Sequence, residues 1–334
     1  MNSLAHVTLP PELPSFAEEI GRFYRARCKK EFGVEALERW SPQAGALRNL
    51  QTVLGRAFPA LRTRHEMIDG HRLVYWDFGN PKGETVVLLH GFAASKENWL
   101  MLAPLLAQHR RLLVPDIPGF GQSCFKPGSD YRGDAQVKRL SQWLTNVSQG
   151  PIHLVGSSMG GALAGLLAAN PELPVASLTL MNSAGVMGKN KSPFELALIE
   201  GRNHLVPATY SEVMDLFRLA THRNRQWLSW MLAPAVYQEM VAREPVNHRL
   251  FQDLIDSEQS FSAIAQVKNP TLILWGNRDR ILDVSCTETL QNMIPHAQTR
   301  VLRGVGHLPM LEVPRLTAAA LQRFWRHGPN RRSD

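Results

Sequence analysis

Short apolar runs alternate with helix-like patterns along most of the chain. The runs lie at residues 86–90, 112–115, 152–155, 178–181, 272–275 and 301–302. Helix-like patterns separate them, for example at residues 160–169. Strands that alternate with helices form βαβ units, so the pattern predicts an α/β fold with a mostly parallel central sheet flanked by helices.

Two further segments extend and interrupt this pattern. Residues 61–79, LRTRHEMIDGHRLVYWDFG, predict a β-hairpin with Asp69-Gly70 in the tight turn. Residues 186–265 contain no strand-like run, and a loop of that length would be unusual, so we predict an inserted helical cap. The apolar side chains of this cap are candidates either for binding substrate or for the core of the cap. They are Leu216, Phe217, Trp227, Trp230 and Met231, with Leu205 as a further apolar neighbour.

The N-terminal region predicts a helical extension. An apolar stripe begins at Phe16, and a second helical pattern runs from Leu47 to Phe58. The first helix also carries a set of basic residues, which are Arg22, Arg25, Arg27, Lys29 and Lys30. A basic amphipathic helix is able to lie on an anionic membrane surface. In the alternative, which we favour, its apolar face packs on the main domain.

The length of 334 residues allows one large domain with an insertion. The predicted division is a helical extension at 1–66, a core at 67–185, a cap at 186–265 and the rest of the core at 266–334. The net charge of +8 is interpreted as a solvated basic surface. Nucleic acid is not an expected partner, because no dense run of Lys and Arg with interleaved aromatic residues occurs.

The termini and the cysteines bear on where the protein acts. The N-terminal residues lack a signal-peptide pattern, and no run of 18 apolar residues occurs. Cys28, Cys124 and Cys286 are widely spaced, which favours reduced thiols over a disulfide framework or a zinc site. We therefore expect a cytoplasmic protein, with peripheral membrane contact through the first helix as the alternative.

The stretch HLVGSSMGGALAG, residues 153–165, follows a predicted strand and begins a predicted helix. Gly156 and Gly160 lie two residues before and two residues after Ser158, whereas Ser157 has bulky residues at the same spacing. A nucleophilic serine on a strained strand-to-helix turn needs small flanking residues, because the backbones there pass close together. The spacing predicts Ser158 as a nucleophile and Ser157 as its scaffold.

A serine nucleophile needs a base, and in such folds an acid and then a histidine follow it along the chain. His307 lies just past the last predicted strand, where a loop can direct the imidazole at the serine, whereas His296 precedes that strand. The loop after the preceding strand offers Asp279 and Asp283. Asp279 lies nearer the end of the strand and is the predicted acid; Asp283, near a helix start, is the runner-up.

An oxyanion needs fixed hydrogen-bond donors. The backbone N–H groups of Phe92, which follows a strand, and of Met159, which follows the serine, are the expected pair. His90 is expected to shape the first of these loops, and Asp116 to organise a loop near the site. GFGQS lacks the spacing and the lysine of a phosphate-binding loop, and no acidic cluster is evident. We therefore expect no cofactor and no metal.

These motifs resemble those of the α/β-hydrolase superfamily from about residue 71 to the C-terminus. They are HGF, DIPGFGQS, GSSMGG, LMNSAGV, WGNRDRILD and GVGHLPMLEVP. HGFAASKENWL, QVKRL and HLVGSSMGGALAG are most similar to monoacylglycerol lipases of the α/β-hydrolase-domain type and to related bacterial esterases and lipases. The resemblance implies a Ser158, Asp279 and His307 triad with the donors Phe92 and Met159. It would also imply a membrane-spanning N-terminal segment, where this chain has a charged helical extension.

The sequence therefore predicts a serine carboxylic ester hydrolase that forms an acyl-enzyme on Ser158. Its expected partner is a small ester or lipid, medium-chain or similar to a monoacylglycerol. Serine at the elbow excludes dehalogenases and epoxide hydrolases, which would carry aspartate there. A meta-cleavage-type C–C bond hydrolase uses the same triad and stays the alternative; it would need an arginine or similar donor in the cap for its acidic dienoate. A binding protein of this fold with vestigial activity is a second alternative, which the intact triad disfavours.

Overall fold

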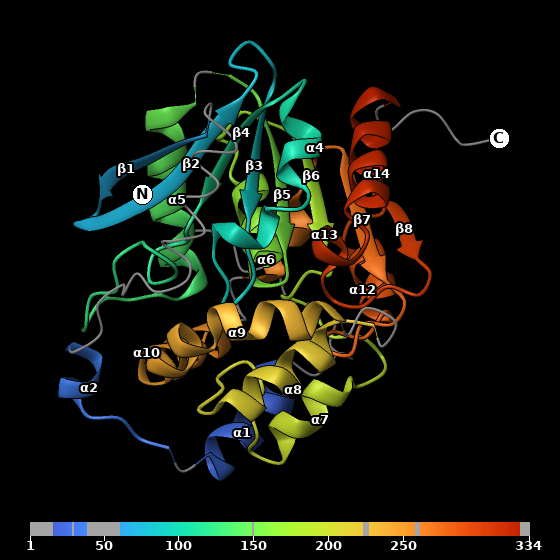
Figure 1. The fold of residues 1–334 in the computed structure, drawn as a ribbon. Coiled ribbons are helices and arrows are strands. Elements are labelled where there is room, and N and C mark those ends of the chain that lie inside the picture. The colour runs from blue at the N-terminus through green and yellow to red at the C-terminus, as the bar shows by residue number, and fades with distance from the viewer. Residues whose placement is uncertain are drawn as a thin grey trace.

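The computed structural model describes residues 16–28, 30–38, 61–148, 150–222, 227–257 and 261–327. Its centre is an eight-stranded sheet with the order β1-β2-β4-β3-β5-β6-β7-β8 (Figure 1). Strand β2 is antiparallel to both of its neighbours, and all the other neighbouring pairs are parallel. The strands are β1 (Arg62–Ile68), β2 (His71–Gly79), β3 (Thr85–Leu89), β4 (Arg111–Pro115), β5 (Ile152–Ser157), β6 (Val175–Met181), β7 (Thr271–Gly276) and β8 (Gln298–Leu302).

Helices cover both faces of the sheet, so the central strands are apolar on both sides. Val87 and Leu89 of β3 belong to the core cluster that α5, α6 and α12 complete. Val86 and Leu88 belong to the opposite cluster, with α4, α13 and α14. These helices and one short 3-10 turn are α4 (Ala103–Ala107), α5 (Gly133–Val147), α6 (Met159–Ala169), α12 (Cys286–Met293), α13 (Pro309–Glu312), α14 (Pro314–His327) and η2 (Lys96–Trp99).

In the described residues of the interval between β6 and β7, helices are the only regular elements. Figure 1 shows its helices gathered beyond one end of the sheet. Helices α8 and α9 pack together through Val213, Met214, Ala233 and Met240. The elements of this interval are α7 (Pro193–Ile199), α8 (Tyr210–Ala220), α9 (Trp227–Ala242), α10 (Glu244–Ile255) and η4 (Ser262–Gln266). We refer to α7–α10 as the cap.

The N-terminal segment packs against the cap (Figure 1). Ile20 and Tyr24 are fully buried, as expected for an apolar face that packs on the protein. The helix ends at Arg27, where the backbone of Cys28 becomes extended, and the Cys28 thiol lies 3.5 Å from Nε2 of His248 in α10. The described elements are η1 (Ala17–Gly21), α1 (Arg22–Arg27) and α2 (Val34–Glu38). The pattern at residues 47–58 lies outside the described residues.

One predicted boundary needs correction. Strand β1 begins at Arg62, so residues 62–66 belong to the sheet and not to the helical extension. The hairpin predicted at residues 61–79 is present, because Arg62 pairs with Asp77 and the pairing continues to Ile68 and His71. The predicted domain boundary at residue 66 therefore falls inside β1, most of whose side chains are exposed. Within the described ranges, none of the helices is long and apolar enough to cross a membrane.

Candidate active site

Ser158 lies on the sharp turn between β5 and α6. Its backbone has φ +55° and ψ −123°, a strained conformation for a residue other than glycine. The Ser158 N–H donates to the carbonyl of Met181 at 3.1 Å. A Cβ atom added at Gly156 would lie 2.0 Å from the carbonyl oxygen of Gly160, and one at Gly160 would lie 2.3 Å from that of Leu89. The backbones therefore pass as closely as the glycine spacing predicts.

Asp279 and His307 meet at the carboxyl ends of β7 and β8. His307 Nδ1 lies 2.7 Å from Asp279 Oδ2, which also accepts from the side-chain amide of Asn182 at 2.6 Å. Asp279 Oδ1 accepts the backbone N–H groups of Ile281 and Leu282 at 2.8 and 3.0 Å. Because an ionised carboxylate only accepts hydrogen bonds, Nδ1 carries the proton and Nε2 is left as the acceptor of the ring.

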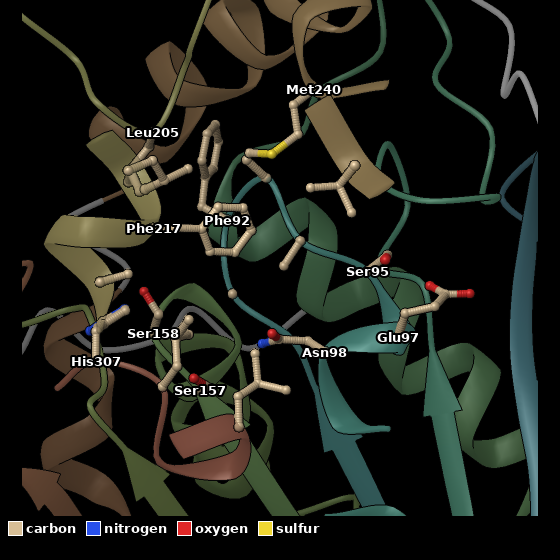
Figure 2. Close-up of a pocket in the computed structure, with 18 of the residues that line it drawn as sticks. Phe92, Ser95, Glu97, Asn98, Ser157, Ser158, Leu205, Phe217, Met240 and His307 are labelled. Atoms are coloured by element: carbon tan, nitrogen blue, oxygen red, sulfur yellow. The ribbon is translucent and has the colours of Figure 1, made fainter. Parts of the chain in front are cut away.

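The other sequence candidates lie elsewhere. Asp283 Oδ1 accepts the N–H of Ser285 at 2.9 Å, in the turn before α12. His296 Nε2 lies 3.0 Å from the carbonyl of Asn269 in an exposed position. Ser158 and the Asp279-bound His307, by contrast, line one cavity (Figure 2). The arrangement brings together a nucleophile, a base and a group that orients the base.

The two expected oxyanion donors flank Ser158. A Cβ atom added at Gly91 would lie 3.1 Å from the Cβ atom of Ser158, so the loop that carries Phe92 runs directly beside the serine. Met159 is the first residue of α6, and the N–H groups of a first helical turn have no acceptor within the helix. Phe92 and Met159 therefore both belong to segments that lie directly beside Ser158.

His90 fixes the loop that carries Phe92 through two hydrogen bonds of its ring. Its Nε2 accepts the N–H of Ile117 at 3.0 Å, so its Nδ1 carries the proton and donates to the carbonyl of Gly91 at 2.8 Å. Complete burial lowers the pKa of His90 to about 4, which keeps the ring neutral in this role. The sequence analysis expected this residue to shape the loop.

Asp116 organises the neighbouring loop together with Lys96, a residue that the sequence analysis did not single out. Asp116 Oδ1 accepts the Lys96 N–H at 2.7 Å, and Oδ2 accepts the Lys96 ammonium at 2.7 Å and the Gln122 N–H at 2.8 Å. Burial lowers the pKa of Lys96, but Asp116 and Glu97 outweigh it and leave the pKa raised. A loop lysine is normally exposed, so no sequence signal pointed to it.

Further hydrogen bonds, which were not predicted from the sequence, stabilise the loop that carries His307. The Glu312 carboxylate accepts the N–H groups of Gly306 and His222, each at 2.9 Å. The His307 N–H donates to the carbonyl of Ala220, the last residue of α8, at 2.7 Å. Asn182, the fourth donor to Asp279, was also not singled out from the sequence, although it lies in the LMNSAGV motif.

The cavity above Ser158 has a volume of about 200 Å³ and lies between the core and the cap. Leu216 and Phe217 line it, and both also pack in the apolar cluster of the cap, so each of the two predicted roles stays open to them. Trp227 and Trp230 do not; they are 55% and 66% exposed. Both tryptophans therefore project away from the protein, while Val236, Glu239 and Met240 of α9 line the cavity. The side chain of Met231 lies outside the described set.

Charged residues line part of the same cavity, and the sequence analysis did not assign them. Figure 2 shows Glu97 away from Ser158 and His307, with Phe217 and Met240 coming from the cap. Arg243 also lines this cavity, and its guanidinium donates to the carbonyl of Gly119. Burial raises the pKa of Glu239 to about 7 and lowers that of Arg243 to about 10. Among the described residues, no cluster of three or more His, Cys, Asp or Glu side chains is suited to a metal ion.

Comparison with known proteins gives a family match and close relatives. A family model described as alpha/beta hydrolase fold matches residues 84–314. Monoacylglycerol lipase abhd6-B of Xenopus laevis is 30% identical over 277 residues, 79% of this chain and 82% of that protein. Lipase 1 of Psychrobacter immobilis is 32% identical over 263 residues, 77% of this chain and 82% of that protein. A solved structure of a membrane phospholipase A, described as a bacterial virulence factor, is 30% identical with a TM-score of 0.76, covering 84% and 90% of the two chains.

Proposed function

The chain belongs to the α/β-hydrolase family, and from its site we propose that it is a serine carboxylic ester hydrolase that forms an acyl-enzyme on Ser158. The predicted fold and the predicted resemblance to lipases are confirmed, because relatives at about 30% identity are lipases. The observation that carries the proposal is the shared cavity of Ser158 and the Asp279-bound His307.

In the proposed mechanism, Ser158 Oγ attacks the acyl carbon while His307 Nε2 takes the hydroxyl proton. Asp279 stabilises the imidazolium through Nδ1–H, and the N–H groups of Phe92 and Met159 stabilise the oxyanion. His307 then gives its proton to the leaving alcohol, and the acyl group stays on Ser158. Water attacks this ester with His307 again as the base, releasing the acid and regenerating the serine hydroxyl.

We further propose a substrate with a medium-chain acyl group or a monoacylglycerol-like ester. The cap side chains Leu216, Phe217 and Met240 support this proposal, because they offer an apolar surface beside the nucleophile. The charged residues Glu97 and Arg243 in the same cavity suit the hydroxyl groups of a polar alcohol such as glycerol.

A meta-cleavage-type C–C bond hydrolase is the second candidate, and Arg243 is the observation that favours it. This buried arginine provides the donor in the cap that an acidic dienoate requires. Glu97 lines the same cavity, however, and would repel a carboxylate that approaches it. Glu239, whose pKa burial raises to about 7, adds to this repulsion above that pH. The ester hydrolase is therefore the better-supported function. Turnover of a 2-hydroxy-6-oxo-dienoate with no turnover of any ester would reverse this order.

The deciding experiment compares p-nitrophenyl esters of graded chain length and a monoacylglycerol on the wild type and two serine variants. Ser158→Ala should lower kcat/KM by about 10⁴-fold or more, because the nucleophile is removed. Ser157→Ala is the matched control and should retain most activity, since its buried hydroxyl has no hydrogen-bond partner among the described residues. Equal activity in Ser158→Ala and the wild type would disprove the mechanism. A fluorophosphonate that fails to label the folded wild type would favour a binding protein.

A further inference from the structure

A second, smaller cavity opens at Ser158. It has a volume of about 70 Å³ and an almost wholly apolar lining. The two cavities share Ser158 and Phe92, but Met159 lines the smaller cavity and His307 lines the larger one. Ser158 therefore lies at the junction of a larger cavity that contains charged side chains and a smaller cavity with none among the described residues that line it.

The chemistry of the proposed reaction assigns the two halves of an ester to these spaces. His307 must deliver a proton to the leaving alcohol, so the alcohol lies on the side of the larger cavity. The acyl group stays bonded to Ser158 with its oxygen toward the N–H of Met159, and its chain extends into the smaller cavity. The linings support this assignment, because Glu97, Glu239 and Arg243 line the larger cavity and not the smaller one, beside apolar cap residues, whereas Ser158 is the one polar residue among the described residues that line the smaller cavity.

The wall of the acyl cavity includes a residue from the beginning of the chain. Phe16 lines it beside Leu254 and Ile255 of α10, whereas Ser158 enters from the core. From its sequence, this N-terminal segment is expected either to bind a membrane or to pack its apolar face on the protein. Because Phe16 also lines the cavity at Ser158, the segment contributes to the site.

Several contacts fix this segment to the cap. The Tyr24 ring packs edge-on against Phe251 with centroids 5.4 Å apart, and Phe251 packs in the same way against Phe92 beside the serine. Arg25 pairs with Asp256 at 2.9 Å. Lys30 Nζ lies 2.5 Å from Glu244 Oε1, and Lys191 pairs with Glu19. Phe16 is therefore held by a docked segment that contacts both α7 and α10.

We propose that Phe16 is a specificity-determining residue that limits the length of the acyl chain. This proposal rests on the proposed ester hydrolysis. A cavity of about 70 Å³ is about half the size of the roughly 150 Å³ cavity that accommodates benzene. It holds only a few carbon atoms, so a medium-length chain fills it and packs against its lining, which includes Phe16.

The test measures kcat/KM for p-nitrophenyl esters from acetate to dodecanoate on the full chain. Phe16→Ala should raise the ratio of dodecanoate to butyrate hydrolysis about tenfold, since one methylene in a closed pocket discriminates by roughly 10- to 200-fold. Phe16→Trp should lower the same ratio. Phe23→Ala is the matched control, because Phe23 lies on the same segment under the guanidinium groups of Arg22 and Arg27. Its chain-length profile should equal that of the wild type.

The opposite shifts in the two Phe16 variants separate a specificity role from general damage, which would lower all rates together. If Phe16→Ala does not fold by circular dichroism, Phe16→Leu takes its place in the comparison. Profiles that are identical in the wild type and in both Phe16 variants would overturn the proposal and leave the ester hydrolase standing. A folded wild type that hydrolyses none of the esters would overturn the proposed function itself.

Discussion

The ammonium of Lys96 and the carboxylate of Asp116 lie 2.7 Å apart, and both side chains are completely inaccessible to solvent. The pair joins the loop after β3, which carries Phe92, to the loop after β4. Each buried charge is stabilised chiefly by its hydrogen-bonded partners, because the interior offers little solvation. The buried ion pair therefore links the two loops, together with the hydrogen bond from the Ile117 N–H to His90.

Asp116→Ala should lower the free energy of unfolding by about 3–5 kcal/mol, because it leaves the Lys96 ammonium buried with fewer acceptors. Lys189→Met is the control, because Lys189 and Glu288 form an ion pair of 2.9 Å on the surface. Its free energy of unfolding should fall by less than about 1 kcal/mol. Urea unfolding measures both. Equal effects for the two variants would contradict the role assigned to the buried pair.

Asp279→Asn should lower kcat by about 10⁴-fold while the protein stays folded, because an amide no longer selects the Nδ1–H tautomer of His307. Asp283→Asn is matched in chemistry and lies in the same loop, yet it contacts Ser285 rather than the histidine. Its kcat should stay close to that of the wild type. Steady-state kinetics on one ester decide between the two aspartates, and a larger loss in Asp283→Asn would exchange their roles.

His90 should make stability depend on pH. Its pKa of about 4 in the folded protein lies below the ordinary value near 6.5, so the unfolded chain binds more protons between these values. Stability is therefore present at pH 7 and lost as the pH falls, by about 2 kcal/mol between pH 7 and 5. His90→Asn should show a correspondingly smaller loss in urea titrations at the two pH values. His153, whose pKa is also about 4 because of burial and Arg110, contributes equally to both proteins.

Gly156→Ala should destabilise the protein by on the order of 3 kcal/mol or more, because the added methyl group meets backbone that cannot move aside. Gly150→Ala makes the same chemical change where no atom lies within 4 Å of the added carbon. It should change stability by less than about 0.5 kcal/mol. Thermal unfolding of both variants measures the difference, and a tolerated Gly156→Ala would show that the elbow does not need its glycine.

The sheet and the arrangement of Ser158, Asp279 and His307 were predictable because their sequence signals are local. Buried parallel strands appear as apolar runs, and the glycines around Ser158 reflect the close approach of Gly156 to the backbone of Gly160. The positions of Asp279 and His307 follow from chain order, since both come directly after neighbouring strands of the sheet.

The side chains that line the two cavities could not be predicted in the same way. Helix α9 has apolar residues around its whole circumference, so nothing in its pattern separates the exposed Trp227 and Trp230 from Met240 at the cavity. Arg243 and Lys96 are charged, and their burial depends on partners far away in the sequence. Phe16 reaches its cavity only through the docking of its segment on α10, a tertiary contact with no local signature.

The hydrogen bond from the His307 N–H to the Ala220 carbonyl has a mechanical consequence for the cap. It fastens the C-terminal end of α8 to the loop that carries His307. Any displacement of this end of the cap must therefore either break the hydrogen bond or move the histidine loop with it.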